Sequence, residues 1–218
     1  MKTTILFDHD GTLIDSETTH YALWKKVLKD YGVDLGFAFY QENMAGVPTT
    51  QNAIDVVKAF SLSVEASVLE GNKHQSLTAY LAKQAFPAMA DTVDVVRRAY
   101  DAGYVLGIVT GGSRESVNTT LSTYGIGECF STIVAVEDVI HSKPAPDCYL
   151  LAMQQLGVNA SQCVAVEDTE HGMRAALGAG ISCAVIPTVL TESLAFEGAC
   201  GRFNSLSDWY DSMARENR

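Results

Sequence analysis

Five short apolar segments, separated mostly by stretches with helical spacing, constrain the fold of this chain more than any other feature. They are rich in aliphatic and β-branched residues and lie at 5–7, 104–109, 132–136, 163–166 and 182–186. Strands that are apolar on both faces are typical of a parallel sheet covered by helices on each side. The pattern therefore predicts an α/β fold with a doubly wound parallel sheet, in which ligands bind beyond the carboxyl ends of the strands.

The long stretch between the first two predicted strands indicates an inserted module. It holds about 95 residues, whereas a simple crossover between parallel strands needs about a dozen. Apolar residues at helical spacing predict three helices in it, at 17–31, 50–60 and 64–84. We therefore predict a helical cap at 15–85, inserted into an α/β core formed by 1–14 and 86–218. A further helix is expected over 91–102, with Asp91 as its N-cap.

The composition argues against several classes of function. The formal net charge of −11 at pH 7 opposes binding to nucleic acid or to an anionic membrane, because both require a basic surface. No apolar run approaches the roughly 20 residues of a membrane helix, and the first apolar segment is too short for a signal peptide. The five cysteines are widely spaced and odd in number, which favours buried reduced thiols. We expect a soluble, cytoplasmic monomer.

The first apolar segment runs directly into two carboxylates, Asp8 and Asp10, and then into Gly11. Side chains alternate along a strand, so these two carboxylates can converge only where the strand ends and the backbone turns. Two close carboxylates repel each other unless a cation keeps them ionised or their proton affinities differ. Taken alone, the motif also fits an acidic loop after an edge strand.

Two further segments carry groups that suit an anionic ligand. The run Thr110-Gly111-Gly112-Ser113 closes the second predicted strand and opens a helix, so its backbone N–H groups can approach a phosphate. Such turns are also rich in Gly and Ser for conformational reasons alone. Lys143 stands in a loop stiffened by two prolines, where an ammonium group can balance both a carboxylate and a phosphoryl group.

Glu167 and Asp168 follow the fourth predicted strand and precede another helix. Asp168 or Thr169 could simply cap that helix. Together with Asp8 and Asp10 at the same edge of the sheet, however, the pair favours a hard cation with oxygen ligands, such as Mg²⁺. The five histidines of the chain lack the paired spacing of a zinc site.

Taken in order, these four segments resemble the signature of the haloacid dehalogenase superfamily, and the resemblance extends over nearly the whole core. The helical insertion and the runs Asp15-Ser16-Glu17, with His20, and Ser142-Lys143-Pro144 resemble the β-phosphoglucomutase-like phosphatases within it. The resemblance implies a Rossmann-like core with a helical cap. It also implies a Mg²⁺-dependent phosphoric monoester hydrolase that acts on small phosphorylated metabolites, such as sugar phosphates or phosphoglycolate-like monoesters.

The resemblance implies a division of labour between the two acids of the first motif. Asp8 would attack phosphorus and form an aspartyl-phosphate, while Asp10 would protonate the leaving alcohol and afterwards deprotonate water. Thr110, with Gly111 and Gly112, would bind the transferring phosphoryl oxygens. Phosphoryl transfer depends on alignment and charge stabilisation, so these assignments agree with its chemistry.

The same resemblance implies how the charge at the site is balanced. Lys143 would offset negative charge on the nucleophile and bind the phosphate. The Mg²⁺ ion would be bound by Asp8, the carbonyl of Asp10 and Asp168, with Glu167 supporting it directly or through water. A metal and a cation together allow a carboxylate to approach an anionic phosphate.

A sugar-phosphate mutase is the main alternative. In the sugar-phosphate mutase of the family that this chain resembles, basic residues that bind a second phosphate stand where this chain has Ala45, Thr49 and Ser113. Their absence favours a hydrolase of monophosphates, because an Arg is the natural ligand of a second phosphate. Arg114 is a candidate substrate contact or an ordinary solvated helix residue. His20 is a candidate substrate contact, and the resemblance implies a hinge or proton-relay group between cap and core; it also fits an ordinary residue of an amphipathic helix.

A phospho-accepting signalling domain is the remote alternative, since it uses similar residues on a similar sheet. In that class the acidic pair precedes the phosphorylated Asp, whereas here the first motif opens the chain and an insertion follows it. His9, between the two acids, stands where the family often has an apolar or aromatic residue. The residues alone assign it no role beyond a contact with the cap.

Overall fold

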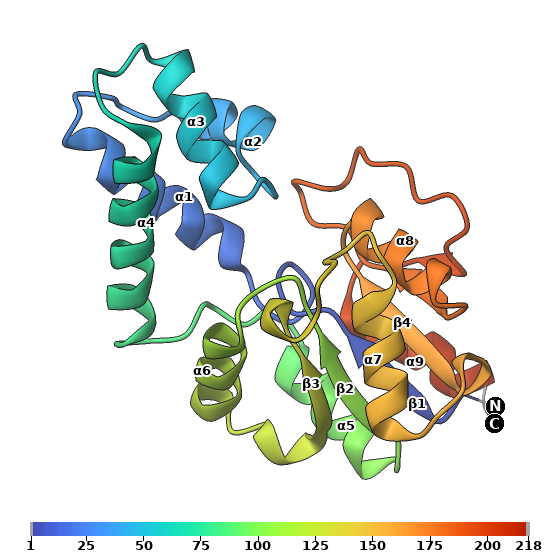
Figure 1. Cartoon of the computed structure of the whole chain (residues 1–218). Coiled ribbons are helices and arrows are strands. Elements are labelled where there is room, and N and C mark those ends of the chain that lie inside the picture. Colours follow the sequence, from blue (N-terminus) through green and yellow to red (C-terminus); the bar gives the residue numbers. More distant parts are fainter. Residues whose placement is uncertain (1, 217–218) are drawn as a thin grey trace. The chain divides into compact units, whose positions relative to one another are not determined.

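The computed structural model describes residues 2–216, which separate into two compact units (Figure 1). The first unit is formed by Met1–Asp15 together with Pro87–Arg218, and the second by Ser16–Phe86. The second unit is thus inserted into the first between the end of strand β1 (Thr4–Phe7) and helix α5 (Thr92–Asp101).

The first unit is built on a six-stranded parallel sheet with the strand order β3-β2-β1-β4-β5-β6. The other strands are β2 (Val105–Val109), β3 (Phe130–Val134), β4 (Cys163–Glu167), β5 (Ser182–Val185) and β6 (Gly201–Arg202). The predicted α/β fold with a parallel sheet is confirmed. Strand β6 was not predicted, because it is only two residues long, lies at the edge of the sheet and contains no apolar run.

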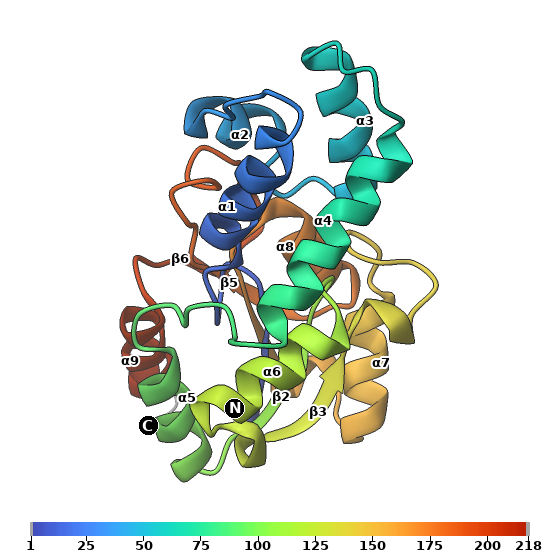
Figure 2. The same ribbon diagram turned by 90° about the vertical axis from the view of Figure 1, so that its left-hand side faces the viewer.

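Helices cover both faces of this sheet, and Figure 2 shows α5 and α9 on one side of it and α7 on the other. The remaining helices of the first unit are α6 (Arg114–Tyr124), α7 (Asp147–Leu156), α8 (Glu170–Gly178) and α9 (Leu206–Glu216). Ile5 and Phe7 pack into one cluster with residues of α5, α6 and α9, whereas Leu6 packs into another with residues of α7 and α8. Successive side chains of β1 thus pack into two different apolar cores, one on each face of the sheet, as in a doubly wound fold.

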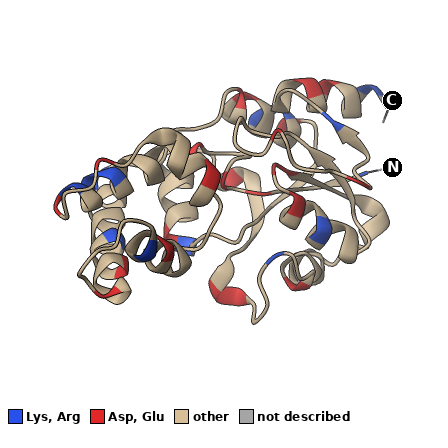
Figure 3. Ribbon diagram, turned by 90° about the horizontal axis from the view of Figure 1, so that it is seen from above, with Lys and Arg blue, Asp and Glu red and all other residues tan. Residues whose placement is uncertain are grey.

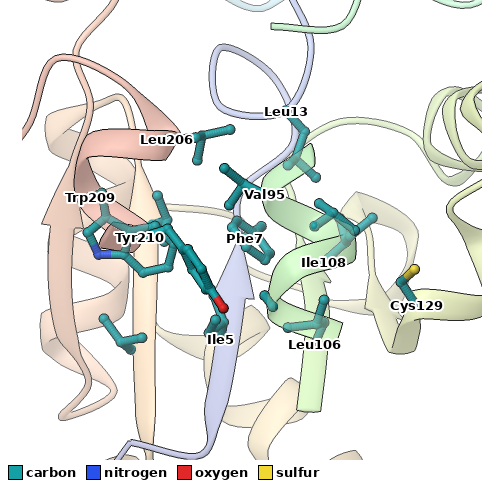
Figure 4. Packing of buried hydrophobic residues seen from close by; sticks show 14 of the residues in the cluster. Ile5, Phe7, Leu13, Val95, Leu106, Ile108, Cys129, Leu206, Trp209 and Tyr210 are labelled. Carbon is teal, nitrogen blue, oxygen red and sulfur yellow. The ribbon is translucent and has the colours of Figure 1, made fainter. Parts of the chain in front are cut away.

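Aromatic packing holds the central strand in place (Figure 4). The Phe7 ring meets the rings of Trp209 and Phe130 edge to face, with centroids 5.9 Å and 6.3 Å apart. Edge-to-face pairs add to the stabilisation from burial alone. The strand that carries Asp8 at its end is therefore a rigid support.

One local prediction is confirmed only in its position, and another is wrong for one residue. Asp91 occupies the position before α5, but its side chain makes no capping hydrogen bond. Its backbone is left-handed, with φ of 65°, whereas a capping side chain reaches the helix from an extended conformation. Cys200 is exposed, unlike the other four cysteines, because it lies in the irregular segment before the short edge strand β6.

The second unit is helical and has its own apolar core. Its helices are α1 (Ser16–Lys29), α2 (Phe37–Asn43), α3 (Thr49–Ala59) and α4 (Ala66–Leu81). Helix α2 was not predicted, since its seven residues are too short for a clear period. Buried side chains from these helices and their connections form one cluster, which includes Trp24, Leu28, Leu35, Tyr40, Val56 and Leu69. The insertion therefore folds around a core rather than running as a loop.

Charged residues of both signs are distributed along the chain (Figure 3). On the surface of the first unit, for example, Arg98 pairs with Asp94 and Asp211. Exposed pairs of this kind add little stability, so the buried clusters carry the fold. Among residues 2–216, no helix combines the length and the apolar character needed to cross a membrane.

Lys73 is fully buried inside the second unit, on α4. Its Nζ lies 2.8 Å from Nδ1 of His20 and 5.8 Å from the centre of the Trp24 ring. Burial lowers the pKa of Lys73 to about 8, although the carboxylate of Glu17 opposes the shift. The ammonium form is thus less stable in the folded state than in the unfolded chain.

We expect the Lys73→Met variant to resist unfolding better than the wild type at pH 7. Between about pH 8 and the ordinary lysine pKa of 10.5, native Lys73 is neutral while the unfolded chain still holds the proton. The unfolding free energy of the wild type therefore rises with pH across this window, by at most about 3 kcal/mol. Urea unfolding of both proteins at pH 7 and pH 9.5 tests this, and an equal pH dependence in the two would contradict it.

Candidate active site

The first two acids lie where β1 ends and the backbone turns. The N–H of Asp8 still donates to the carbonyl of Val166 on β4, at 2.9 Å, so Asp8 follows the sheet. Gly11 then turns the chain with φ of +83°. A Cβ on Gly11 would lie 2.2 Å from Oδ2 of Asp168, so a side chain there would be strained and would also collide with a carboxylate. The glycine allows the ends of β1 and β4 to approach each other.

Glu167 and Asp168 lie beside Asp8 because β1 and β4 are adjacent and parallel. Both side chains are buried. The hydroxyl of Thr169 accepts a hydrogen bond from the N–H of Gly172, at 3.1 Å. Thr169 rather than Asp168 therefore caps α8, and helix capping does not account for the buried carboxylate of Asp168.

Lys143 links the ends of three strands. Its Nζ donates to Oδ1 of Asp8 and to Oε1 of Glu167, both at 2.6 Å, and to the carbonyl of Val109, at 2.8 Å. The hydroxyl of Tyr149 donates to the same Glu167 oxygen at 2.7 Å. The three bonds from Nζ hold the Lys143 ammonium, and the bond from Tyr149 fixes the Glu167 oxygen that accepts one of them. The lysine predicted from its loop thus contacts the first and last acidic motifs at once.

Burial dominates the proton affinities of this cluster. It raises the pKa of Asp8 and, together with repulsion from Asp8, raises the pKa of Glu167 to about 7 and that of Asp168 well above its usual value. Burial opposes the charged form of Lys143 as well, but the carboxylates of Asp8 and Glu167 outweigh it and hold the lysine pKa above its ordinary value. One ammonium therefore faces three acids that resist ionisation.

The same three acids are arranged as a cation site. Asp8, Glu167 and Asp168 each offer a carboxylate oxygen, and these oxygens lie within 4.8 Å of one another. Within the described part of the chain, Oε2 of Glu167 and Oδ1 of Asp168 are buried without a hydrogen-bond partner. Buried carboxylate oxygens without partners are costly, and a hard divalent cation prefers oxygen ligands. These three carboxylates fit such an ion. The side chain of Asp10 is not among them, and the prediction that Asp10 binds the metal concerned its backbone carbonyl.

The loop after β2 places small groups beside Asp10. The hydroxyl of Thr110 accepts from the N–H of Gly112, at 2.9 Å, and lies 3.3 Å from Oδ2 of Asp10, to which it donates. A Cβ on Gly112 would lie 2.6 Å from that same oxygen, so this glycine is required for the close approach. Gly111 completes the loop, and Ser113 caps α6. The N-terminus of α6 thus begins a few residues after Thr110, with Ser113 as its N-cap, which favours an anion near this loop.

Two predicted substrate contacts have other partners in the structure. The guanidinium of Arg114 forms an ion pair with Asp138 and donates to the carbonyl of Ile133 at 3.1 Å. His20 belongs to the second unit, where it contacts Lys73. A role in substrate binding stays a prediction for both residues.

Sequence reasoning missed Tyr149 and gave His9 no role in the core. Tyr149 lies in the first turn of α7, where the only signal was its position shortly after the proline-rich loop of Lys143. The side chain of His9 is completely buried, and its two ring nitrogens lie next to the side chains of Thr120 and Asp10. Both nitrogens therefore contact the first unit, although the residues alone suggested only a contact with the cap.

Comparison with known proteins places this site in a family. A model of the family described as "Haloacid dehalogenase-like hydrolase" matches residues 5–186. The chain is 32% identical to the fructose-1-phosphate phosphatase YqaB of Escherichia coli K12, over 81% of this chain and 92% of that protein. It is also 32% identical to a validoxylamine A 7'-phosphate phosphatase of Streptomyces hygroscopicus subsp. limoneus, over 86% and 87% of the two chains.

A solved structure similar to this one is that of a CbbY variant from Rhodobacter sphaeroides in complex with xylulose-(1,5)bisphosphate. The two chains are 28% identical, and the match covers 95% of this chain and 96% of that one with a TM-score of 0.80. Similarity in sequence and in fold therefore extends over both units of the chain.

Proposed function

Because the chain belongs to the haloacid dehalogenase-like hydrolases and is a phosphoric monoester hydrolase, we propose that it dephosphorylates small phosphorylated metabolites through an aspartyl-phosphate. The substrate class is sugar phosphates or similar monoesters. One relative is named for fructose 1-phosphate, and a similar structure holds xylulose-(1,5)bisphosphate. These names support the substrate class.

One observation carries the proposal. The Lys143 ammonium is bonded to Asp8 and Glu167, each at 2.6 Å, next to two buried carboxylate oxygens without partners. Such a cluster would be an unfavourable arrangement in a purely structural core, because buried acids resist ionisation. A phosphatase needs it, since an anionic nucleophile and an anionic substrate must be brought together among compensating cations.

In the first step we assign the attack on phosphorus to an oxygen of Asp8. The new bond joins this carboxylate oxygen to phosphorus, and the bond between phosphorus and the alcohol oxygen breaks. Asp10 gives its proton to that departing oxygen. Thr110 and the backbone of Gly111 and Gly112 hold the phosphoryl oxygens during transfer.

In the second step Asp10, now ionised, takes a proton from water as the water oxygen attacks phosphorus. The aspartyl-phosphate bond breaks, inorganic phosphate leaves and the carboxylate of Asp8 is restored. Lys143 offsets the charge on Asp8 in both steps. A Mg²⁺ ion bound by Asp8, Asp168 and the Asp10 carbonyl, with support from Glu167, would supply further positive charge for the phosphoryl group.

The function is tested by phosphate release from a panel of monoesters. We expect release from fructose 1-phosphate or a related sugar phosphate with Mg²⁺ present, at least about 100-fold lower release with EDTA, and recovery when Mg²⁺ is returned. Mg²⁺ should also raise the melting temperature of the wild type, because it binds the folded state. The Asp168→Asn variant should lose most of this rise.

The outcomes also separate the alternatives. Conversion of glucose 1-phosphate to its isomer only when a bisphosphate is supplied, without phosphate release, would favour the mutase. A phosphorylated protein that persists for many minutes would favour the signalling domain. Phosphate release that is unaffected by EDTA would contradict the role of the metal, and no release from any ester in the panel would contradict the hydrolase.

A further inference from the structure

The imidazole of His9 connects α6 with the loop that follows β1. The ring is completely buried. Its Nε2 lies 3.0 Å from the hydroxyl of Thr120, which is also buried, on α6. Its Nδ1 lies 3.4 Å from Oδ2 of Asp10. One ring thus contacts an anchored helix on one side and a proposed catalytic carboxylate on the other.

Both nitrogens of this buried ring have polar partners. Burial of a polar ring is costly unless its nitrogens are hydrogen-bonded. When Asp10 is ionised it can only accept, so Nδ1 carries the hydrogen and Nε2 accepts from the Thr120 hydroxyl. An apolar side chain would fill the same space without this cost. The polar ring therefore needs an explanation other than packing.

The contacts of Asp10 provide that explanation. Its Oδ2 is approached by Thr110 Oγ1 at 3.3 Å as well as by the His9 ring. The hydroxyl comes from the end of β2, whereas the imidazole is anchored on α6. Two groups thus contact the same carboxylate oxygen. The imidazole, which has no part in holding the phosphoryl group, can restrict rotation of the carboxylate about its Cβ–Cγ bond throughout the reaction.

We propose that His9 is a positioning residue that orients the Asp10 carboxylate for proton transfer. The inference rests on the proposed function, in which Asp10 is the acid and then the base. The transferred proton moves between Asp10 and the alcohol or water oxygen, while His9 keeps its own hydrogen throughout. Proton transfer depends steeply on alignment, so loss of the His9 contact should slow the steps that need Asp10.

Two amide variants separate the two contacts of the ring. The side-chain nitrogen of Asn lies near the position of Nδ1, so His9→Asn keeps a donor toward Asp10 and loses the partner of Thr120. The side-chain nitrogen of Gln lies near the position of Nε2, so His9→Gln keeps a group at Thr120 and loses the donor toward Asp10. These two variants are therefore matched controls for each other.

Two substrates separate positioning from a structural effect. An alkyl phosphate, such as the best sugar phosphate of the panel, needs protonation of its leaving oxygen, whereas p-nitrophenyl phosphate releases a stable anion without it. We expect His9→Gln to lower kcat/KM for the alkyl phosphate by about 10- to 100-fold and for p-nitrophenyl phosphate by less than about threefold. His9→Asn keeps the donor toward Asp10 but loses the anchor on Thr120, so it should show a smaller loss on the alkyl phosphate than His9→Gln.

The Asp10→Asn variant, measured alongside, distinguishes failure of this inference from failure of the proposed function. Asp10→Asn should show the same substrate-dependent loss, only larger. If its kcat/KM, which reports the first step, instead falls equally on both substrates, the acid role of Asp10 in the proposed function is wrong. If Asp10→Asn behaves as expected and His9→Gln loses activity equally on both, or not at all, His9 is not a positioning residue.

The Thr120→Val variant tests the anchoring of the His9 ring even if the His9 variants do not fold. Val has nearly the shape of Thr but lacks the hydroxyl that anchors the ring. We expect kcat/KM of Thr120→Val to fall less than that of His9→Gln, and again to fall more for the alkyl phosphate than for p-nitrophenyl phosphate. Melting curves check that the variant is folded. An equal loss on both substrates, or wild-type activity on both, would overturn the inference.

Discussion

Replacement of Asp8 by Asn is expected to abolish turnover, with kcat lowered by about four orders of magnitude or more. An amide oxygen is too weak a nucleophile to form the acyl-phosphate. The fold should survive, because burial already disfavours the charged form of Asp8 and the amide oxygen can still accept from Lys143. Phosphate release and a melting curve, both measured on the purified variant, check the two parts of this prediction.

A matched control for Asp8→Asn is the same change at Asp94. Asp94 lies in the first turn of α5, and its side chain is largely exposed, in an ion pair with Arg98. Asp94→Asn should therefore retain full activity. Near-normal activity of Asp8→Asn would show that another group attacks phosphorus. Unfolding of Asp8→Asn in the presence of EDTA would instead show that the negative charge of Asp8 is needed for stability.

Replacement of Lys143 by Met should reduce both activity and stability. Removal of the ammonium leaves Asp8 and Glu167 buried without their cation, and breaking a buried pair in this way costs about 3 to 5 kcal/mol. Loss of a cation beside the transferring phosphoryl group should lower kcat by about 100-fold or more. Urea unfolding in EDTA and phosphate release with Mg²⁺ measure the two effects separately.

The loss of stability in Lys143→Met should depend on pH. The pKa of native Glu167 is raised from 4.5 to about 7, so the folded state binds the proton more tightly than the unfolded chain. Stability from this group is present below about pH 4.5 and is lost as the pH rises through about 7. Without Lys143 to favour the ionised form, this loss should be larger. The variant should therefore differ less from the metal-free wild type at pH 5 than at pH 8.

The double variant Lys143→Met with Glu167→Gln provides the control. Neutralising Glu167 removes one of the two carboxylates that the ammonium had balanced, so part of the lost stability should return, while activity should not. If the double variant is no more stable than Lys143→Met alone, loss of packing by the lysine stem, rather than uncompensated charge, explains the effect.

The α/β fold and the acids of the site were accessible from the sequence because their signals are local. Apolar runs predict buried strands without knowledge of their neighbours, and in a parallel sheet the residue after each run must lie at the carboxyl edge. Asp8 and Asp168 could therefore be placed at one edge. Short elements such as α2 and β6 carry too few residues for a period, and they were missed for that reason.

The strand order decided which of those acids meet. Because β1 lies between β2 and β4, Asp8 is next to Glu167 and to the carbonyl of Val109. Because these three strands are neighbours, Lys143 bonds to Asp8, Glu167 and the Val109 carbonyl at once. A linear pattern contains no information about which strands are neighbours, since several orders accommodate the same elements.

The contacts of individual side chains likewise cannot be derived from their positions in the sequence. Arg114 follows the proposed phosphate-binding loop in the sequence, yet Asp138 binds its guanidinium. His9 lies between two acids in the sequence, yet its ring also contacts Thr120, which is on a different element. Such pairings join residues that are distant along the chain, and they follow from packing rather than from spacing.

By itself, the sequence determined the parallel sheet, the inserted helical unit and the residue types at the strand ends, because periodicity and turn chemistry act over a few neighbouring residues. The tertiary structure alone decided the partners of those residues: Lys143 between Asp8 and Glu167, Thr169 as the cap of α8, and His9 against Asp10. The physical reason is that burial and hydrogen bonding depend on which elements pack together, and packing is a property of the whole chain.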